Sequence, residues 1–355
     1  MVARRVIASV VQRQVKYVKT VPVATAGDLV AAVYRQAADE MRLVVPPVLL
    51  HSPSPQTLAA YWMLMRETLM TAGAADRLAK EAVAAAVSVA NICPYCVDMH
   101  SIGMYDLANE HDAEAVAGDR VDEVADPRVR DLAAWARVAH QPDAAVHRKP
   151  PFAEAERAEL VGVAVSFHYL GRMVNVFLSN FLLPPRLGPR ARRRVKQGLS
   201  LALSPTLREI RPVGRAVALL PDAPLPADVA WARGHPGVAA AAARSFAAFE
   251  RAGARSVPPA VRQLVQERLA QWRGEEAGLS REWCERLVAD LPAPDQAAGR
   301  LALLTAFASH QVDEDTVREF RGGEPRDAAL VEVTAWASYA AARRVGSFHL
   351  IECAS

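Results

Sequence analysis

Two cysteines and a histidine form the pattern in this sequence that is best suited to chemistry. Cys93 and Cys96 are separated by Pro94 and Tyr95, and His100 follows, which gives the spacing C-x-x-C-x-x-x-H. On an α-helix these three side chains share one face, because they are three and four residues apart. Pro94 favours the first position of a helix, so Cys93 is predicted to be the N-cap residue, with Cys96 in the first turn. The helix dipole and a nearby imidazole both favour a thiolate there, which indicates a redox-active dithiol.

Other uses of a C-x-x-C pair lead to different expectations. A structural zinc site usually has four ligands, for which His100 and either Cys284 or Cys353 could complete the set. A thioredoxin-like site needs a β-strand before the pair, whereas residues 79–90 have a helical pattern. A further alternative is a pair of buried, inert thiols. We favour a redox dithiol without metal or cofactor, because Cys284 and Cys353 are lone cysteines in the other half of the chain.

The composition favours a helical protein with a sizeable core. Of the 355 residues, 52% are hydrophobic and only 6% aromatic, and alanine fills many apolar positions. The net charge of +3 does not indicate a nucleic-acid partner, and four cysteines are too few for a secreted disulfide scaffold. The sequence has neither the apolar core of a signal peptide nor a run of about 18 apolar residues for a membrane span. We therefore expect an all-α, cytoplasmic protein with no membrane span and no nucleic-acid partner.

Helical periodicity and proline positions predict the order of the elements. Residues 1–30 are predicted to form a basic amphipathic arm, packed on the body or on a neighbouring subunit, or else attached to an anionic surface. Further helices are predicted at 56–70, 77–90, 129–140 and 154–182. Residues 186–226 form a connection rich in proline and arginine. We interpret its basic stretch, 186–196, as a solvated linker or a subunit contact, because no stacking aromatic residue accompanies it.

The chain contains an internal duplication. Residues 132–145 resemble residues 302–315, and residues 158–170 resemble residues 328–340, both at an offset of 170. Two separate blocks with one offset indicate two related units, which we place at 31–185 and 227–355. His140 and His310 are one matched pair, and we interpret them as structural residues near helix ends.

The first unit resembles the AhpD-like alkylhydroperoxidases of the carboxymuconolactone decarboxylase superfamily. These all-helical proteins have a glutamate, then C-x-x-C, then a histidine, a pattern matched here by Glu81, Cys93, Cys96 and His100. Residues 51–53 and 167–177 are also similar, so the resemblance covers residues 45–185. It implies a duplicated AhpD-like fold. An offset of about 185 places Gln266, Gly278, Arg281 and Glu285 opposite the four site residues. The second copy is therefore expected to be degenerate and to lack this chemistry.

The resemblance also implies a role for each site residue. Cys96 would reduce a small-molecule peroxide to an alcohol and become a sulfenic acid, and Cys93 would resolve it to a disulfide. His100 and Glu81 would form the proton relay. A dithiol electron donor, either a lipoyl-bearing protein or a thioredoxin-like one, would regenerate the pair. Family members form homo-oligomers, which we expect here too. Decarboxylase members of the superfamily work without the cysteine pair.

The residues alone leave several alternatives open. In one straight helix Glu81 would lie about 18 Å from Cys93, so the relay requires a break near residues 91–94. Glu81 could instead pair with Arg77 on the helix surface, with Asp98 and Glu110 as substitute carboxylates. His168, Tyr169 and Arg172 are interpreted either as part of the same pocket or as buried polar groups with partners.

Two other functions are compatible with the same motif. One is acid–base tailoring, isomerase or decarboxylase-type chemistry on a small carbonyl compound, with Cys96 and His100 as acid and base. The other is a non-enzymatic redox sensor, in which the disulfide changes assembly.

Overall fold

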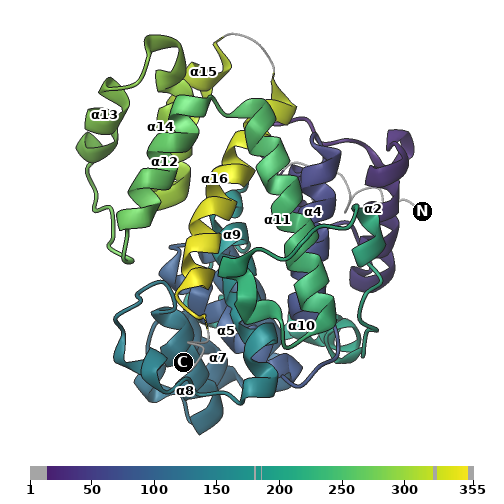
Figure 1. Ribbon diagram of the computed structural model, residues 1–355. Coiled ribbons are helices and arrows are strands. Elements are labelled where there is room, and N and C mark those ends of the chain that lie inside the picture. Colours follow the sequence, from purple (N-terminus) through teal and green to yellow (C-terminus); the bar gives the residue numbers. More distant parts are fainter. Residues whose placement is uncertain (1–13, 180, 185, 323–325, 351–355) are drawn as a thin grey trace.

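The protein is built almost entirely from helices, as the computed structural model in Figure 1 shows. The structure describes residues 14–179, 181–184, 186–322 and 326–350, and within these ranges there is no β-strand, only two isolated bridges. The all-α fold class predicted from the sequence is confirmed. The helices that precede residue 186 are α2 (Asp28–Met41), α3 (Pro46–Leu50), α4 (Pro55–Met65), α5 (Arg77–Ala90), α6 (Pro94–Leu107), α7 (Glu110–Ala117), α8 (Pro127–Arg137) and α9 (Glu154–Phe177).

The starts of these helices follow from local chemistry. The Asp76 side chain accepts a hydrogen bond from the Ala79 amide at the start of α5, and Asp126 caps α8 in the same way. Proline occupies the first turn of α4, α6 and α8, where a missing N–H costs no helical hydrogen bond. A π-helical turn, Arg66–Met70, follows α4, so the predicted helix 56–70 is present with a change of winding near its end.

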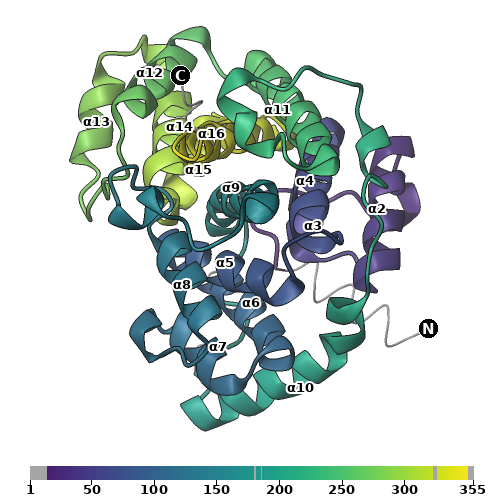
Figure 2. The ribbon, with the colours of Figure 1, turned by 60° about the horizontal axis from the view of Figure 1, so that its bottom comes forward.

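The second half repeats the order of the first. It contains α11 (Pro236–Ser256), α12 (Pro259–Gln271), α13 (Glu282–Ala289), α14 (Gln296–Ala308), α15 (Glu314–Arg321) and α16 (Asp327–Ser347). At the offset of 170, α8 corresponds to α14 and α9 to α16. The two halves meet where α16 packs along α9 and α11 along α4 (Figure 2). The arrangement is consistent with a duplicated helical unit.

Helix α9 lies at the centre of the molecule. By length and composition alone it could cross a membrane, but its most apolar 18-residue stretch is completely buried inside the protein. Helices α5, α16, α4 and α11 all contact it. Its apolar character is therefore that of a core helix, and it ends at Phe177, earlier than the predicted residue 182.

The prediction of an N-terminal amphipathic helix is wrong for the part that the structure describes. Residues 1–13 lie outside the described ranges, but residues 14–22 contain no helix. The Lys16 amide donates a hydrogen bond to the Phe177 carbonyl (2.7 Å), and Val15 forms a bridge with Leu178. The β-branched valines of this segment suit extended backbone better than helix, and Pro22 lacks the amide hydrogen that a helix would use.

The basic stretch at 186–196 is not an open linker. Most of it belongs to α10 (Pro189–Arg208), which packs against α6. In Figure 2, α10 runs along the edge of the first unit, beside α7. Lys196 is only 2% exposed, because its ammonium group is turned towards α6 and α7. The sequence showed the charges of this stretch but not the acidic partners of Arg192 and of the buried Lys196.

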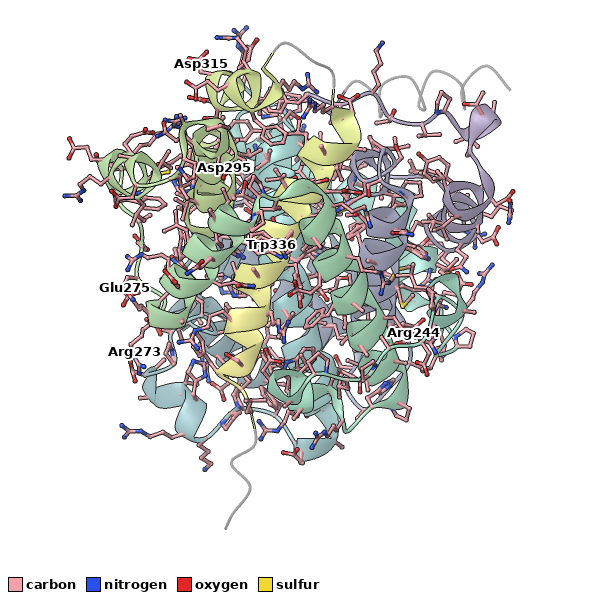
Figure 3. All side chains as sticks on the ribbon, turned by 45° about the horizontal axis from the view of Figure 1, so that its top comes forward. Arg244, Arg273, Glu275, Asp295, Asp315 and Trp336 are labelled. Atoms are coloured by element: carbon pink, nitrogen blue, oxygen red, sulfur yellow. The ribbon has the colours of Figure 1, made fainter. Side chains whose placement is uncertain are left out.

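Two glycine substitutions, one in the contact of α11 with α16 and one on the exposed face of α10, are predicted to change the stability in opposite directions. A Cβ atom at Gly253 would lie 2.2 Å from Cδ1 of the fully buried Trp336, which Figure 3 places on α16. We expect Gly253→Ala to lower the free energy of unfolding by about 1–3 kcal/mol. Gly198, in the exposed face of α10, has no atom within 4 Å of such a Cβ, so Gly198→Ala should stabilise the protein by about 0.5–1 kcal/mol. Urea unfolding measures both; equal stabilities would contradict the described helix packing.

Candidate active site

The cysteine pair lies where the chain reverses between α5 and α6. Helix α5 ends at Ala90, and α6 begins at Pro94 with Cys93 as its N-cap residue, the arrangement predicted from the sequence. Ile92 has a positive φ of 51°, which a β-branched residue rarely adopts. The Cys93 amide donates to the Ser88 carbonyl (3.0 Å), so the last turn of α5 closes the reversal. This turn folds α6 back against α5.

Asn91 fixes this turn to the central helix α9. Its side-chain amide donates to the Val87 carbonyl (2.9 Å), and its Oδ1 accepts from Arg172 Nη1 (2.8 Å). The Asn91 main-chain carbonyl accepts from Asn175 Nδ2 (3.0 Å). Side-chain and main-chain groups of one residue thus connect the turn both to α5 and to α9. These hydrogen bonds stabilise the strained backbone of the turn at Ile92.

The reversal brings Glu81 and His100 together. Glu81 Oε2 lies 2.6 Å from His100 Nδ1, and Glu81 Oε1 accepts from Arg77 Nε (2.8 Å). Both partners considered for Glu81 therefore bind it at once, one to each carboxylate oxygen. Gly103 makes the approach possible, because a Cβ there would lie 3.1 Å from Glu81 Oε2. The edge of His100 meets the ring of Phe167, with centroids 4.4 Å apart.

The Glu81 carboxylate is ionised despite its burial. Burial alone would raise its pKa, but Arg77 and His100 outweigh that effect and hold the pKa at about 2. Only 2% of Glu81 is exposed. An ionised carboxylate on Nδ1 assigns the Nδ1–H tautomer to His100 and leaves Nε2 as the atom able to accept a proton.

The two cysteines are buried and reduced. Cys93 is 1% exposed and Cys96 is 3% exposed, and both are free thiols. A hydrogen bond with Cys93, burial, and the charge of a Cys93 thiolate raise the pKa of Cys96 well above its usual value. These effects oppose the helix dipole, which was expected to favour a thiolate at Cys96. The dipole supplies only about half an elementary charge, whereas full burial acts on the whole thiolate charge.

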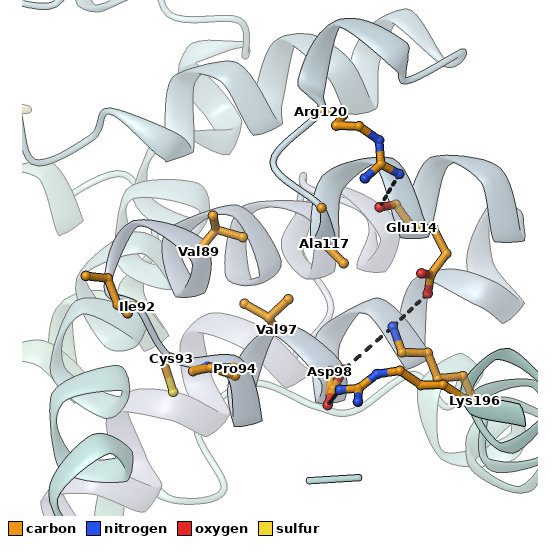
Figure 4. A pocket seen from close by; sticks show the side chains of 12 residues that line it. Val89, Ile92, Cys93, Pro94, Val97, Asp98, Glu114, Ala117, Arg120 and Lys196 are labelled. Carbon is orange, nitrogen blue, oxygen red and sulfur yellow. Dashed lines mark hydrogen bonds and ion pairs between the residues drawn. The ribbon is translucent and has the colours of Figure 1, made fainter. Parts of the chain in front are cut away.

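A cavity of about 370 Å³ opens beside the pair (Figure 4). Its apolar wall includes Val89, Ile92 and Val97, and Cys93 belongs to its lining, whereas Cys96 does not. The remaining wall is charged: Asp98, Glu114, Arg120, Arg192 and Lys196. Lys196 Nζ donates to Glu114 Oε1 (2.7 Å), and both Arg192 and Lys196 pair with Asp98.

The sequence did not predict this charged wall, because two of its cations, Arg192 and Lys196, come from α10, far along the chain. The feature of the sequence that pointed to this wall is the basic stretch 186–196. It contains no acidic residue, so any acidic partner of its cations has to come from another segment. Asp98 and Glu110, considered as substitute carboxylates, pair with α10 instead. Asp98 binds Arg192, and Glu110 accepts from Gln197 Nε2 (2.7 Å).

The three polar residues predicted on α9 have separate positions. Tyr169 is buried, with its hydroxyl 2.8 Å from His51 Nε2. His168 and Arg172 line a second cavity, on the other side of the turn, that does not include either cysteine. His168 and Arg172 are connected to the cysteine turn through Asn91, to which both are hydrogen-bonded.

The second unit keeps one trace of the motif. When α13 is aligned with α6 by their N-cap residues, Arg281 takes the place of Cys93, and Cys284 takes the place of Cys96. Val288 then replaces His100. This register differs by three residues from the offset used in the sequence comparison. Cys284 is fully buried, and burial together with the charge of Glu285 raises its pKa to about 12, so this thiol is not activated as a thiolate.

The described part of the chain contains no cluster of side chains that fits the zinc alternative. No group of three histidine, cysteine or acidic side chains there is arranged to hold a metal ion. Cys353 lies outside the described residues.

Two comparisons with known proteins identify relatives of this chain. The model of the carboxymuconolactone decarboxylase family matches residues 56–138, which include α5, α6 and the cysteine pair. A Mycobacterium tuberculosis protein named alkyl hydroperoxide reductase is 36% identical over 336 residues, covering 94% of each chain. The chain belongs to this family. The relative extends through both units, so the similarity of this AhpD-like protein is not limited to the half that carries the dithiol.

The Glu81 carboxylate predicts an acid-dependent loss of stability. Its pKa lies below that of an unfolded glutamate, so its contribution is complete above about pH 4.5 and is lost as the pH falls towards 2. At pH 7 we expect Glu81→Gln to lower the free energy of unfolding by about 3 kcal/mol, because a buried ion pair loses one partner.

The difference between Glu81→Gln and the wild-type protein should shrink between pH 5 and pH 3 in chemical unfolding. Glu123→Gln is a matched control, since Glu123 pairs with Arg120 at the surface. It should change stability by less than about 1 kcal/mol. A Glu81→Gln effect that is constant with pH would contradict the depressed pKa.

Proposed function

We propose that this AhpD-like protein is a thiol-dependent peroxidase that reduces alkyl hydroperoxides. The observation that carries the proposal is the 2.6 Å contact of Glu81, on α5, with His100, on the helix that begins with the C-x-x-C motif. A dithiol and a carboxylate-oriented histidine are the parts needed to deprotonate a thiol and to protonate a leaving alkoxide. The name of the Mycobacterium tuberculosis relative supports the same activity.

In the first step, Cys96 attacks the hydroperoxide. His100 Nε2 accepts the Cys96 proton, and the thiolate sulfur attacks the terminal oxygen of R–O–O–H. The O–O bond breaks, a sulfenic acid forms on Cys96, and the alkoxide takes the proton from His100 to leave as an alcohol. Sulfur is oxidised by two electrons, and the peroxide is reduced by two. Glu81, ionised and bound to Nδ1, stabilises the imidazolium that exists between the two proton transfers.

In the second step, Cys93 resolves the sulfenic acid. The Cys93 sulfur attacks Cys96, a disulfide forms, and the hydroxyl leaves as water. Three residues apart at a helix start, the pair has the Cα separation of a few ångströms that a disulfide requires. An external dithiol, on a lipoyl-bearing or thioredoxin-like protein, then reduces the disulfide and is itself oxidised. The position of Cys93 in the cavity lining supports attack by this donor at Cys93.

Mass spectrometry of single cysteine variants tests this assignment. One equivalent of an alkyl hydroperoxide should lower the mass of the reduced protein by about 2 Da, mapped to Cys93–Cys96. Cys96→Ser should show no oxidation, whereas Cys93→Ser should gain about 16 Da as the sulfenic acid. Cys284→Ser is the matched control, since it removes a buried thiol at the corresponding position of α13 and should react like the wild type.

Two outcomes would contradict the proposal. Stable oxidation of Cys93 in Cys96→Ser would exchange the roles of the two cysteines. No oxidation in the wild-type protein would exclude a peroxidase and favour acid–base chemistry by Cys96 and His100. Turnover with a dithiol donor separates a peroxidase from a redox sensor, because a sensor is oxidised once without sustained consumption of peroxide.

The raised pKa of Cys96 predicts how the rate of reaction of its thiol depends on pH, in oxidation and in alkylation alike. Below its pKa, the thiolate fraction rises about tenfold per pH unit, so the rate should increase steeply from pH 7 to pH 9. Cys93→Ala removes the neighbouring group that raises the pKa, and its profile should shift to lower pH. The rate of Cys96 alkylation by iodoacetamide measures both profiles. A wild-type rate that is flat across this range would show that the thiolate is already formed.

A further inference from the structure

A second cavity, of about 190 Å³, lies between the two units. The first unit contributes Ile92 and His140, and the second contributes Trp272, Phe307 and His310 to its lining. His140 and His310 are the pair related by the offset of 170, so the cavity lies across the duplication. It shares Ile92 with the cavity beside Cys93 but contains neither cysteine.

A buried cation lines this cavity, and it has no carboxylate partner within the described part of the chain. Arg172 is 7% exposed, and its hydrogen bonds go to the Ala306 and His168 carbonyls, to the His168 ring at Nδ1 and to the Asn91 side chain. All of these acceptors are uncharged. Burial lowers the pKa of Arg172 to about 10, so the guanidinium remains charged at pH 7. Buried charges are normally paired, because an unpaired ion loses its hydration without compensation.

Two buried histidine nitrogens also lack partners here. His168 Nε2 has no hydrogen bond within the described residues, and His168 is only 1% exposed. His140 Nδ1 is likewise buried without a partner. The His140 and His168 rings lie 5.8 Å apart by their centroids, so the two unpartnered nitrogens belong to neighbouring rings in one cavity. Native proteins rarely leave buried polar atoms unsatisfied, so such atoms lining a cavity are available to a bound water or ligand.

The wall contributed by the second unit is aromatic. Trp272 stacks on His140 with centroids 6.3 Å apart, and Phe307 meets the edge of Trp272 at 6.0 Å. Glu275 and Glu276 also line the cavity, but both are exposed at its mouth, and Glu275 Oε2 accepts from the Arg273 amide (2.9 Å). Figure 3 shows Glu275 at the edge of the molecule. These carboxylates therefore do not neutralise Arg172 inside.

We propose that this cavity binds a small organic carboxylate, with the carboxylate on Arg172 and on the unpartnered His140 Nδ1, and a flat apolar body against Trp272 and Phe307. An aromatic or apolar carboxylate satisfies both halves of the lining, whereas an inorganic anion leaves the aromatic wall unused. Because Arg172 also holds Asn91, the bound carboxylate contacts the network that fixes the cysteine turn. The proposal concerns binding alone and does not depend on the peroxidase activity.

Isothermal titration with benzoate tests the site on the full chain. We expect saturable binding of one benzoate per chain and no comparable binding of benzyl alcohol, which has the ring without the charge. Arg172→Met should weaken benzoate binding at least about tenfold, since it removes the only cation in contact with the carboxylate. Arg244→Met is the matched control, because Arg244 pairs with Asp222 on another face, away from Glu275 in Figure 3.

A second variant keeps the test independent of the turn. Glu276 is exposed at the mouth, so Glu276→Lys should leave the fold intact and tighten benzoate binding about threefold at low salt, with the gain lost at high salt. Equal binding of benzoate and benzyl alcohol, or unchanged affinity in both Arg172→Met and Glu276→Lys, would overturn the proposal. Tighter binding of inorganic phosphate than of benzoate would also overturn it, in favour of a plain oxyanion site.

Discussion

The hydrogen bonds of Asn91 determine where every group at the dithiol lies. A straight continuation of α5 would carry the cysteines away from Glu81, whereas a turn tied to α9 lays α6 alongside α5. Asn91 provides these ties through both its amide and its main-chain carbonyl. The next residue, Ile92, lines both cavities, so the turn separates two spaces as well as two helices.

Three groups near this turn are similarly buried but differ in how their charge is balanced. Glu81 has an arginine at one oxygen and a histidine ring nitrogen at the other, and it stays ionised. Cys96 is buried beside Cys93, and both effects raise the pKa of its thiol. Arg172 has only neutral acceptors within the described residues and keeps its charge because a guanidinium is so difficult to deprotonate. Similar burial therefore has different consequences for the three groups, depending on their neighbours and on their intrinsic pKa values.

Local sequence features predicted much of the site. The proline after Cys93 located the start of α6, and the distance from Glu81 to Cys93 required a break at the observed turn. Features that depend on distant contacts were not predictable in this way. The environment of Lys196 depends on acids in α6 and α7, and the extended path of Val15 depends on the end of α9. The state of Cys96 depends on burial, which periodicity cannot measure.

The register of the degenerate copy shows a related limit. The offset of about 185 placed Arg281 opposite Cys96, whereas alignment of the helix starts places Cys284 there. The loops between the helices differ in length, so one offset cannot hold along both units. Family membership and the all-α class did not depend on this register, because they rest on the pattern of the first unit and on similarity along most of the chain.

The contact of α9 with α16 joins two related units within a single polypeptide. Dilution cannot separate these partners, because their effective concentration is set by the chain that connects them rather than by the amount of protein. A substitution in α9 also changes one side of the contact only, whereas in a symmetric dimer it would change both sides at once. The two halves are therefore free to diverge. One half can keep the reactive residues while the other supplies aromatic walls and packing surface. Two identical subunits could not divide these roles, because each would carry the same residues.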